Sequence, residues 1–204
     1  YRQLDDELDY PLTICRLAPN TDIIELEWLD ESGTAPGEYE IYFKPVDASE
    51  FKILKTNENK AVLSGLFPDT EYELFVAAGK QKSRTRLAQT GFVPGTVVNY
   101  LHPRDDAYQF SGRYLCSPSI VKLPNGALLA SMDVYASKAP QNLSMIFRSD
   151  DGGATWQYST ELFPCFWGKL FVHKGNLYML AMSTEYGDIL IGKSTDGGYT
   201  FCLP

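Results

Sequence analysis

Apolar and polar residues alternate in short runs along most of this chain, and that period of two is the pattern of half-buried β-strands. Ile24, Leu26 and Trp28 occupy alternate positions, so they place three apolar side chains on one face of a strand, and residues 39–43 have the same spacing. Turn residues interrupt these runs at intervals of about 8–12 residues between positions 10 and 90, as they do in β-sandwiches. No stretch has the period of a long amphipathic helix, so the pattern predicts an all-β protein.

The second half of the chain contains two further groups of strand-like runs. Each group predicts one four-stranded antiparallel sheet, because tight turns such as Pro124-Asn125-Gly126 and Lys174-Gly175 separate its strands. The predicted strands are residues 117–123, 127–134, 143–149 and 155–160 in the first sheet, and residues 169–173, 176–183, 188–194 and 200 onward in the second.

One turn occurs twice in this region, with the copies 45 residues apart. Its pattern is Ser-x-Asp-x-Gly-x-Thr followed by an aromatic residue. The Asp carboxylate accepts bonds from nearby backbone N–H groups, the Gly pair admits positive φ, and the aromatic ring anchors the turn in apolar packing. A fixed period near 45 residues with strand content is typical of an array of repeated sheets. The two copies are Ser149, Asp151, Gly153, Thr155 and Trp156, and Ser194, Asp196, Gly198, Thr200 and Phe201.

This repeated turn resembles the Asp box, or BNR repeat, of the sialidase-like β-propellers. The resemblance implies that residues 92–204 form the first two four-stranded blades of such a propeller, with the second blade incomplete in its last strand. Because a closed propeller has roughly 4–8 blades, we expect the remaining blades C-terminal to residue 204. In that family the Asp box is a structural turn away from the catalytic face.

Residues 1–91 resemble a fibronectin type III domain. Residues 66–76 contain the pattern Leu-x-Pro-x-Thr-x-Tyr-x-x-x-Val, which resembles the corner between two late strands in that family. The resemblance implies that Tyr72 packs its ring inward while its hydroxyl bonds to upstream backbone. The expected architecture is therefore a fibronectin type III-like β-sandwich, a linker at residues 91–96, and a partial sialidase-like propeller.

Composition excludes several classes of function. The net charge is −8, and residues 1–95 carry 17 acidic against 10 basic side chains, so nothing favours binding to nucleic acid. No apolar run approaches the roughly 20 residues of a membrane-spanning helix. The four cysteines and two histidines lack the spacing of a metal site, and we expect no metal and no cofactor. The compartment stays open, although the combination of these two domains favours a secreted or cell-surface protein.

Two smaller features bear on partners and on redox state. The basic stretch at residues 80–86 predicts either an exposed loop that balances an acidic domain or a contact with an acidic partner or glycan. Cys15 and Cys116 lie in apolar strand-like runs, which favours buried free thiols over a disulfide.

The sialidase resemblance implies an arginine cluster, an acidic proton donor and a late tyrosine nucleophile with a glutamate partner, and here the sequence departs from the family. The family's first-strand motif is close to Phe-Arg-Ile-Pro, whereas the matching stretch reads Leu115-Cys116-Ser117-Pro118, so Cys116 stands in the place of the arginine. The proton donor would fall in the loop 139–142, which has no carboxylate. The tyrosine and its glutamate would lie beyond residue 204. Because glycosidic cleavage needs a carboxylic acid, we expect no hydrolysis of simple sialosides by this chain.

Other residues have the chemistry of a sugar site, since aromatic rings stack on sugar faces and charged groups bond hydroxyls. Asp133 and Glu185 are the catalytic candidates, although a carboxylate that caps backbone amides explains Asp133 equally well. Trp167 is either a sugar platform or a packing residue, and His173 is either a base for a lyase-type reaction or structural. The candidates for substrate binding are Arg113, Gln141, Asn142, Trp167, Lys169 and Tyr186.

These patterns predict the N-terminal part of a carbohydrate-active protein whose partner is a glycan or polysaccharide. The leading hypothesis is a glycoside hydrolase of the sialidase-like superfamily that acts on a glycan other than a simple sialoside. The alternatives are a non-catalytic propeller that binds glycans or proteins, and a polysaccharide lyase.

Overall fold

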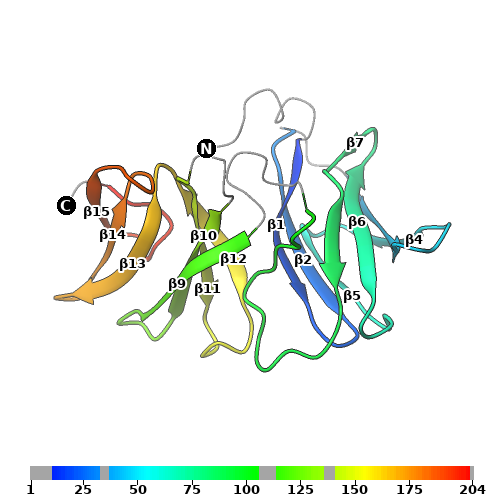
Figure 1. Cartoon of the computed structure of the whole chain (residues 1–204), viewed down its shortest axis with the longest axis horizontal. Helices are drawn as coiled ribbons and strands as arrows, with labels where there is room; N and C mark the ends of the chain where they lie inside the picture. Colours follow the sequence, from blue (N-terminus) through cyan, green and yellow to red (C-terminus); the bar gives the residue numbers. More distant parts are fainter. Residues whose placement is uncertain (1–10, 33–36, 106–113, 136–140, 203–204) are drawn as a thin grey trace. The chain divides into compact units, whose positions relative to one another are not determined.

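The computed structural model describes residues 11–32, 37–105, 114–135 and 141–202, and every regular element in these ranges is a β-strand (Figure 1). The chain therefore belongs to the all-β class, as its hydrophobic pattern predicted. It divides into two compact units, residues 2–107 and 108–204. Residues 92–107, which we expected at the start of the second domain, are grouped with the first unit.

The first unit is a sandwich of two antiparallel sheets. One sheet has the order β1-β2-β5, and the other has the order β4-β3-β6-β7 with β8 also paired to β6. Strands far apart in the chain thus lie side by side, as β3 does with β6. The two sheets and their strand order give this unit a fibronectin type III-like fold. The strands are β1 (Leu12–Pro19), β2 (Ile24–Asp30), β3 (Tyr39–Pro45), β4 (Lys52–Thr56), β5 (Lys60–Leu63), β6 (Glu71–Ala78), β7 (Gln81–Lys82) and β8 (Arg86–Gln89).

Alternation along the strands forms the core of this sandwich. Trp28, Ile41 and Leu74 lie on the inner faces of β2, β3 and β6 and are fully buried, and burial of each such side chain stabilises the fold by about 1.5–3 kcal/mol. The ring of Tyr72 is also buried, and its hydroxyl accepts a hydrogen bond from the backbone N of Phe67 at 2.9 Å. Both features of Tyr72 match what the fibronectin type III resemblance implied.

Two buried arginines tie residues 97–105 to the sandwich. Arg16, on β1, donates from Nε to the carbonyl oxygen of Val98 at 2.9 Å and pairs with the carboxylate of Glu25 at 3.0 Å. The side chain of Asn99 accepts a hydrogen bond from the backbone of β1 at 3.1 Å. The chain that follows the predicted linker is therefore bound to the first unit.

Arg86, on β8, makes the second tie. Its Nε donates to Oδ2 of Asp105 at 2.6 Å, and the two side chains are 3% and 0% exposed. Its remaining nitrogens donate to the carbonyl oxygens of Ile14 at 2.9 Å and Tyr100 at 3.4 Å. The prediction of an exposed basic loop at residues 80–86 is therefore wrong at Arg86, because its buried guanidinium pairs with Asp105 and donates to backbone carbonyl oxygens.

The second unit contains two antiparallel sheets in which consecutive strands pair, with the orders β12-β11-β10-β9 and β13-β14-β15. The strand expected from residue 200 onward appears in the described chain as an isolated bridge between Lys193 and Cys202. The arrangement of these sheets as propeller blades stays a prediction. The strands are β9 (Tyr114–Lys122), β10 (Leu128–Tyr135), β11 (Ser144–Ser149), β12 (Gln157–Leu162), β13 (Phe166–His173), β14 (Asn176–Met182) and β15 (Ile189–Ser194).

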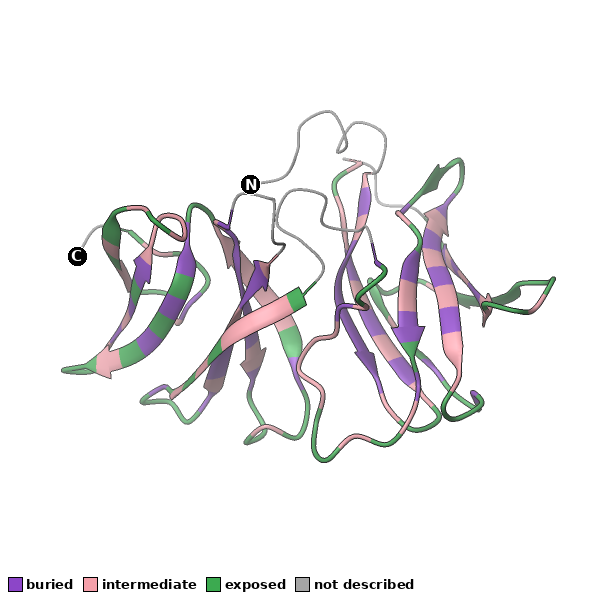
Figure 2. Cartoon of the chain, in the orientation of Figure 1, coloured by how far each residue is buried: buried purple, intermediate pink, exposed green. Residues whose placement is uncertain are grey.

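The two sheets of this unit share one apolar cluster. Leu129 and Ile146 of the first sheet cluster with Leu170, Leu177 and Met179 of the second. Buried and exposed residues alternate along β13 in Figure 2, so one face of the second sheet contributes to this cluster and the other is open. The open face carries four exposed apolar side chains, Phe171, Leu180, Ile189 and Ile191.

The cross-strand registers show that this open face has a counterpart in the first sheet. The two sheets can be aligned on Ser149 and Ser194, the first residues of the two repeated turns. In this alignment the residue pairs between β10 and β11 correspond to those between β14 and β15. The aligned row of the first sheet faces the second sheet, because the hydroxyl of Ser119 accepts the backbone N–H of Leu170 at 3.1 Å. The open face of the second sheet is thus equivalent to a covered face of the first. The aligned rows are Ser119, Ser131 and Ile146 in the first sheet, and Lys169, Leu180 and Ile191 in the second.

Candidate functional site

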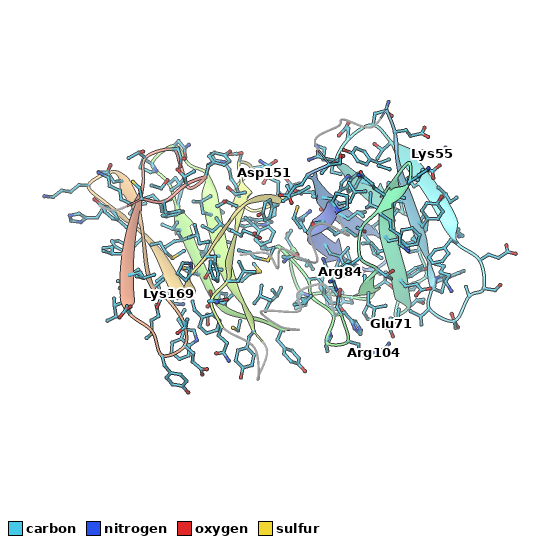
Figure 3. All side chains as sticks on the ribbon, turned by 90° about the horizontal axis from the view of Figure 1, so that it is seen from above. Lys55, Glu71, Arg84, Arg104, Asp151 and Lys169 are labelled. Atoms are coloured by element: carbon cyan, nitrogen blue, oxygen red, sulfur yellow. The ribbon has the colours of Figure 1, made fainter. Side chains whose placement is uncertain are left out.

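The strand connections bring most of the predicted site residues to one end of the second unit. Asp133 lies near the end of β10, and Trp167 and Lys169 lie near the start of β13. At this end β9 has a β-bulge opposite β10, and β13 has one opposite β14. The loop 183–188 is at the same end, because the end of β14 pairs with the start of β13. We call this the bulge end. The repeated turns follow β11 and β15, which run away from it, and Figure 3 shows Asp151 and Lys169 well apart.

Asp133 is the buried centre of the bulge end, with 1% of its surface exposed. One carboxylate oxygen accepts the hydroxyl of Ser144, and the other accepts the backbone N–H of Trp167 at 2.8 Å. Burial raises the pKa of Asp133, and its hydrogen bonds from Ser144 and Trp167 act against that rise. A carboxylate with both oxygens occupied and no access to solvent is suited to capping backbone amides, which favours the structural alternative for Asp133 over catalysis.

Trp167 and Lys169 present their side chains to solvent beside this buried carboxylate. Trp167 is 44% exposed, and its backbone has a φ of +54°. The ammonium of Lys169 donates to the carbonyl oxygen of Pro118 on β9 at 3.1 Å, so it links the first strands of the two sheets. An exposed aromatic ring and an ammonium group at one end of a sheet are residue types that sugar sites use.

The other candidates at the bulge end differ in accessibility. Tyr186 is 89% exposed in the loop 183–188, and Glu185 next to it is half-buried. Gln141 is buried, whereas Asn142 is half-buried and its carbonyl oxygen accepts the backbone N–H of Cys165 at 2.9 Å. Of this group, Tyr186 has the surface for contact with a large ligand.

Two residues of the sequence prediction are not part of this group. Arg113 lies outside the described residues, as do positions 139 and 140 of the loop 139–142. His173 is at the far end of β13, where it pairs with Asn176 across the hairpin turn. The fold thus separates His173 from Asp133 and Trp167, and a lyase-type site that uses His173 together with them is not supported.

Sequence reasoning did not single out Ser144, which completes the surroundings of Asp133. Its hydroxyl donates to the Asp133 carboxylate and lies 3.2 Å from the carbonyl oxygen of Cys165. A serine within an apolar strand has no characteristic spacing, so its role follows from the pairing of β10 with β11. Burial also raises the pKa of the Cys165 thiol to about 11, which makes this free cysteine a packing residue rather than a nucleophile.

The first repeated turn is closed by its own side chains. Asp151 accepts the hydroxyl of Ser149 at 2.7 Å, and it accepts both the backbone N–H of Thr155 at 2.9 Å and its hydroxyl at 2.6 Å. The indole N–H of Trp156 donates to the carbonyl oxygen of Gly153 at 3.1 Å. Gly153 has a φ of +97°, a value that glycine adopts without a side-chain clash. These contacts lie within eight residues and leave the carboxylate no role in chemistry.

The second turn repeats the hydrogen bonds of the aspartate and adds a contact with the first sheet. Asp196 accepts the hydroxyls of Ser194 at 2.8 Å and Thr200 at 2.6 Å. Arg148, on β11, donates to the carbonyl oxygen of Gly197 at 3.3 Å. The second turn therefore joins its own sheet to the preceding one.

The repeated turns should make the second unit acid-sensitive. Hydrogen bonds from Thr155 and Thr200 hold the pKa values of Asp151 and Asp196 well below the ordinary range. An unfolded Asp titrates near about 3.9, so the two carboxylates stabilise the folded unit above that pH, and this stabilisation is lost as the pH falls through their folded pKa values. We expect the urea midpoint of the second unit, followed by Trp156 fluorescence, to fall steadily below about pH 4.

The matched variants for this prediction remove the threonine donors. In Thr155→Val/Thr200→Val the two pKa values move up toward the ordinary one, so the acid dependence of the midpoint should be shallower than in the wild type. Thr160→Val, on β12, removes a hydroxyl that contacts no carboxylate and should leave the slope unchanged. An equal slope in all three proteins would contradict the prediction.

Within the described ranges, no three or more His, Cys, Asp and Glu side chains gather closely enough to hold a metal ion. In the same part of the chain, no helix has the length and apolar character that crossing a bilayer requires.

No protein-family model matches the chain, and no curated protein matches its sequence. Among solved structures, the chain is similar to a fibronectin type III domain of human contactin 1, with 20% identity, coverage of 41% of this chain and 75% of that one, and a TM-score of 0.34. For the FN5 domain of Drosophila Lar the values are 19%, 42%, 99% and 0.34. For a fibronectin type III domain of the human collagen alpha-1(XX) chain they are 21%, 43%, 86% and 0.32. The fold of the first unit is assigned on its strand order and pairing.

Proposed function

We propose that this chain is the N-terminal part of a carbohydrate-active protein, and that its second unit is the start of a sialidase-like propeller that binds a glycan at the bulge end. The propeller proposal is supported by two meandering sheets with matching registers, each followed at the same end by the same turn. Lys169 and Leu170 of β13 bond to Pro118 and Ser119 of β9, so the first strands are neighbours, as the inner strands of adjacent blades are.

The open face of the second sheet supports a continuation of the array. Four apolar side chains are exposed there, and their counterparts on the first sheet are covered by the second. An exposed apolar face of this kind is an interaction surface. We propose that a third sheet of the same repeat covers this face. The second sheet has the same strand register as the first sheet, whose equivalent face is covered by the second.

The glycan proposal depends above all on the exposed ring of Trp167. Trp28 and Trp156 are buried, whereas Trp167 is 44% exposed, two residues from Lys169 in the chain and at the same end as Tyr186. Rings of this type stack on the apolar faces of sugars, and the ammonium group supplies hydrogen bonds to hydroxyls or an ion pair with an acidic sugar. The described groups thus have the chemistry of a binding site.

Binding is favoured over hydrolysis for the described part of the chain. Most glycosidases use two carboxyl groups, one on either side of the bond that is cleaved, and sialidases use a tyrosine nucleophile together with carboxyl groups. Asp133 is buried and its two oxygens accept hydrogen bonds from Ser144 and Trp167, and Glu185 is half-buried in the loop 183–188, so the described carboxyl groups are not arranged as an exposed pair. A hydrolase built on this scaffold would take its carboxyl pair from other residues of the protein.

The test is a binding screen of the full chain against an oligosaccharide panel with neutral, uronic-acid and sialic-acid-terminated members. Because Trp167 is the exposed tryptophan, binding should quench intrinsic fluorescence, and Trp167→Ala should weaken the tightest interaction by about tenfold or more, as loss of a central aromatic contact does. Chromatography of the same mixtures detects released sugars, and we expect none.

Tyr199→Ala is the matched control. Tyr199 is an exposed aromatic residue of the same unit, but it lies in the second repeated turn at the opposite end and contacts Arg148. This variant should bind the oligosaccharide as the wild type does. Absence of binding across the panel, or equal losses of affinity in the two variants, would refute the glycan site. Release of sugar would show that the protein hydrolyses the oligosaccharide rather than only binding it.

A further inference from the structure

Two residues at the bulge end have a backbone conformation that ordinary side chains avoid. Ser117 on β9 has a φ of +50° and Trp167 on β13 has a φ of +54°. Both lie in the β-bulges of their strands, and the aligned registers make them equivalent positions of the two sheets. A left-handed conformation at a residue other than glycine persists only where neighbouring contacts enforce it, and such residues gather at functional sites.

One carboxylate lies beside both of these residues. Asp133 accepts the backbone N–H of Trp167 at 2.8 Å, and the side chain of Ser117 is near enough to lower the pKa of the Asp133 carboxyl. It is itself held by the hydroxyl of Ser144 and by the register of β10, which pairs it with Cys116. The bulge removes the Trp167 N–H from the ordinary strand ladder, so the carboxylate replaces the lost acceptor.

We infer that Asp133 is the positioning residue of the proposed glycan site, where its carboxylate fixes the left-handed turn at Trp167 and thereby the direction of the exposed indole ring. The ligand in this inference rests on the proposed function, whereas the effect of Asp133 on the backbone of Trp167 does not. The sequence suggested Asp133 as a catalytic residue. Because Asp133 is buried, it would instead act on a ligand through Trp167.

The two roles make opposite predictions for Asp133→Asn. The amide oxygen of Asn can accept the Trp167 N–H while its NH2 group donates to the oxygen of Ser144, so the turn should be retained. A catalytic acid has no such substitute, because an amide does not transfer a proton. Asp133→Ala removes both acceptors and should release the turn.

The first experiment is a ¹H–¹⁵N NMR spectrum of each full-chain variant, with the Trp167 amide as the reporter and the Gly153 and Gly198 amides as indicators that the unit is folded. We expect the Trp167 amide to shift strongly in Asp133→Ala and to stay close to its wild-type position in Asp133→Asn. Ser144→Ala, which removes a partner of Asp133 but not the bond to Trp167, should shift it far less than Asp133→Ala. An unmoved Trp167 amide in Asp133→Ala would overturn the inference.

A measurement on the wild type covers the case in which Asp133→Ala does not fold. The Trp167 amide should exchange slowly with deuterium although the side chain is exposed, because the N–H is bonded to a buried acceptor. Rapid exchange, at the rate of the exposed loop residue Tyr186, would overturn the inference without any variant.

The ligand arm uses the oligosaccharide that binds most tightly in the screen. Asp133→Asn should bind it within about twofold of the wild type, and Asp133→Ala should lose about tenfold, which matches the loss in Trp167→Ala. Equal binding by Asp133→Ala and the wild type would overturn the positioning role. If no oligosaccharide binds, the proposed function fails while the NMR and exchange results still decide the role of Asp133.

Discussion

Arg86→Ala should destabilise the first unit by about 3–5 kcal/mol, which is the cost of leaving one member of a buried ion pair without its partner. Asp105 would remain fully buried without its ion pair to Arg86, and the carbonyl oxygens of Ile14 and Tyr100 would each lose a donor. Chemical denaturation followed by Trp28, which lies in the core of this unit, measures the effect in a Trp156→Phe/Trp167→Phe background.

Arg104→Ala is the matched control for this prediction. Arg104 also pairs with a carboxylate, that of Glu71, but its side chain is 63% exposed, and exposed pairs contribute about 0–1 kcal/mol. The double variant Arg86→Met/Asp105→Leu should recover part of the stability that Arg86→Ala loses, because it removes both charges of this buried pair. Similar losses in Arg86→Ala and Arg104→Ala would contradict the structural role assigned to Arg86.

Gly198→Ala should destabilise the second unit by about 2–4 kcal/mol, through backbone strain and overpacking together. Gly198 has a φ of +101°, and a Cβ at this position would lie 2.5 Å from Cδ1 of Leu129 and 3.3 Å from Cδ2 of Leu177. Leu129 belongs to the preceding sheet, so the substitution pushes the second repeated turn away from the shared apolar cluster. The urea midpoint of the second unit, read from Trp156, measures the loss.

Gly152→Ala separates the two contributions. Gly152 also has a positive φ, of +78°, but nothing lies within 4 Å of a Cβ built there. Its substitution should cost the backbone strain alone, and Gly198→Ala should exceed it by about 1–3 kcal/mol. Equal effects in the two variants would show that the close approach of Gly198 to Leu129 has no energetic weight.

Local patterns predicted the strands, because side-chain alternation and turn residues are properties of neighbours in the sequence. The run at Ile24, Leu26 and Trp28 forms the inner face of β2, and the corner at Tyr72 has the contacts that its motif implied. The contacts of Asp151 also follow from residue types within one short segment.

Contacts between distant segments were beyond the reach of these patterns. Arg86 belongs to a run of basic residues, and only the approach of residues 97–105 shows that it is buried. The residues with positive φ in the two bulges, Ser117 and Trp167, are not glycines, so the sequence does not indicate their conformation. Asp133 could be named as a candidate from its residue type, but its burial depends on β9, β11 and β13 together.

The aligned registers carry one more consequence. At the position of the second sheet that corresponds to Asp133 stands Met182, a thioether that cannot accept hydrogen bonds as a carboxylate does. The two sheets thus share their turns and their pairing, but only the first of these two sheets carries a carboxylate at this position. The hydrogen bond that supports the left-handed residue at the bulge end therefore has no equivalent made by Met182.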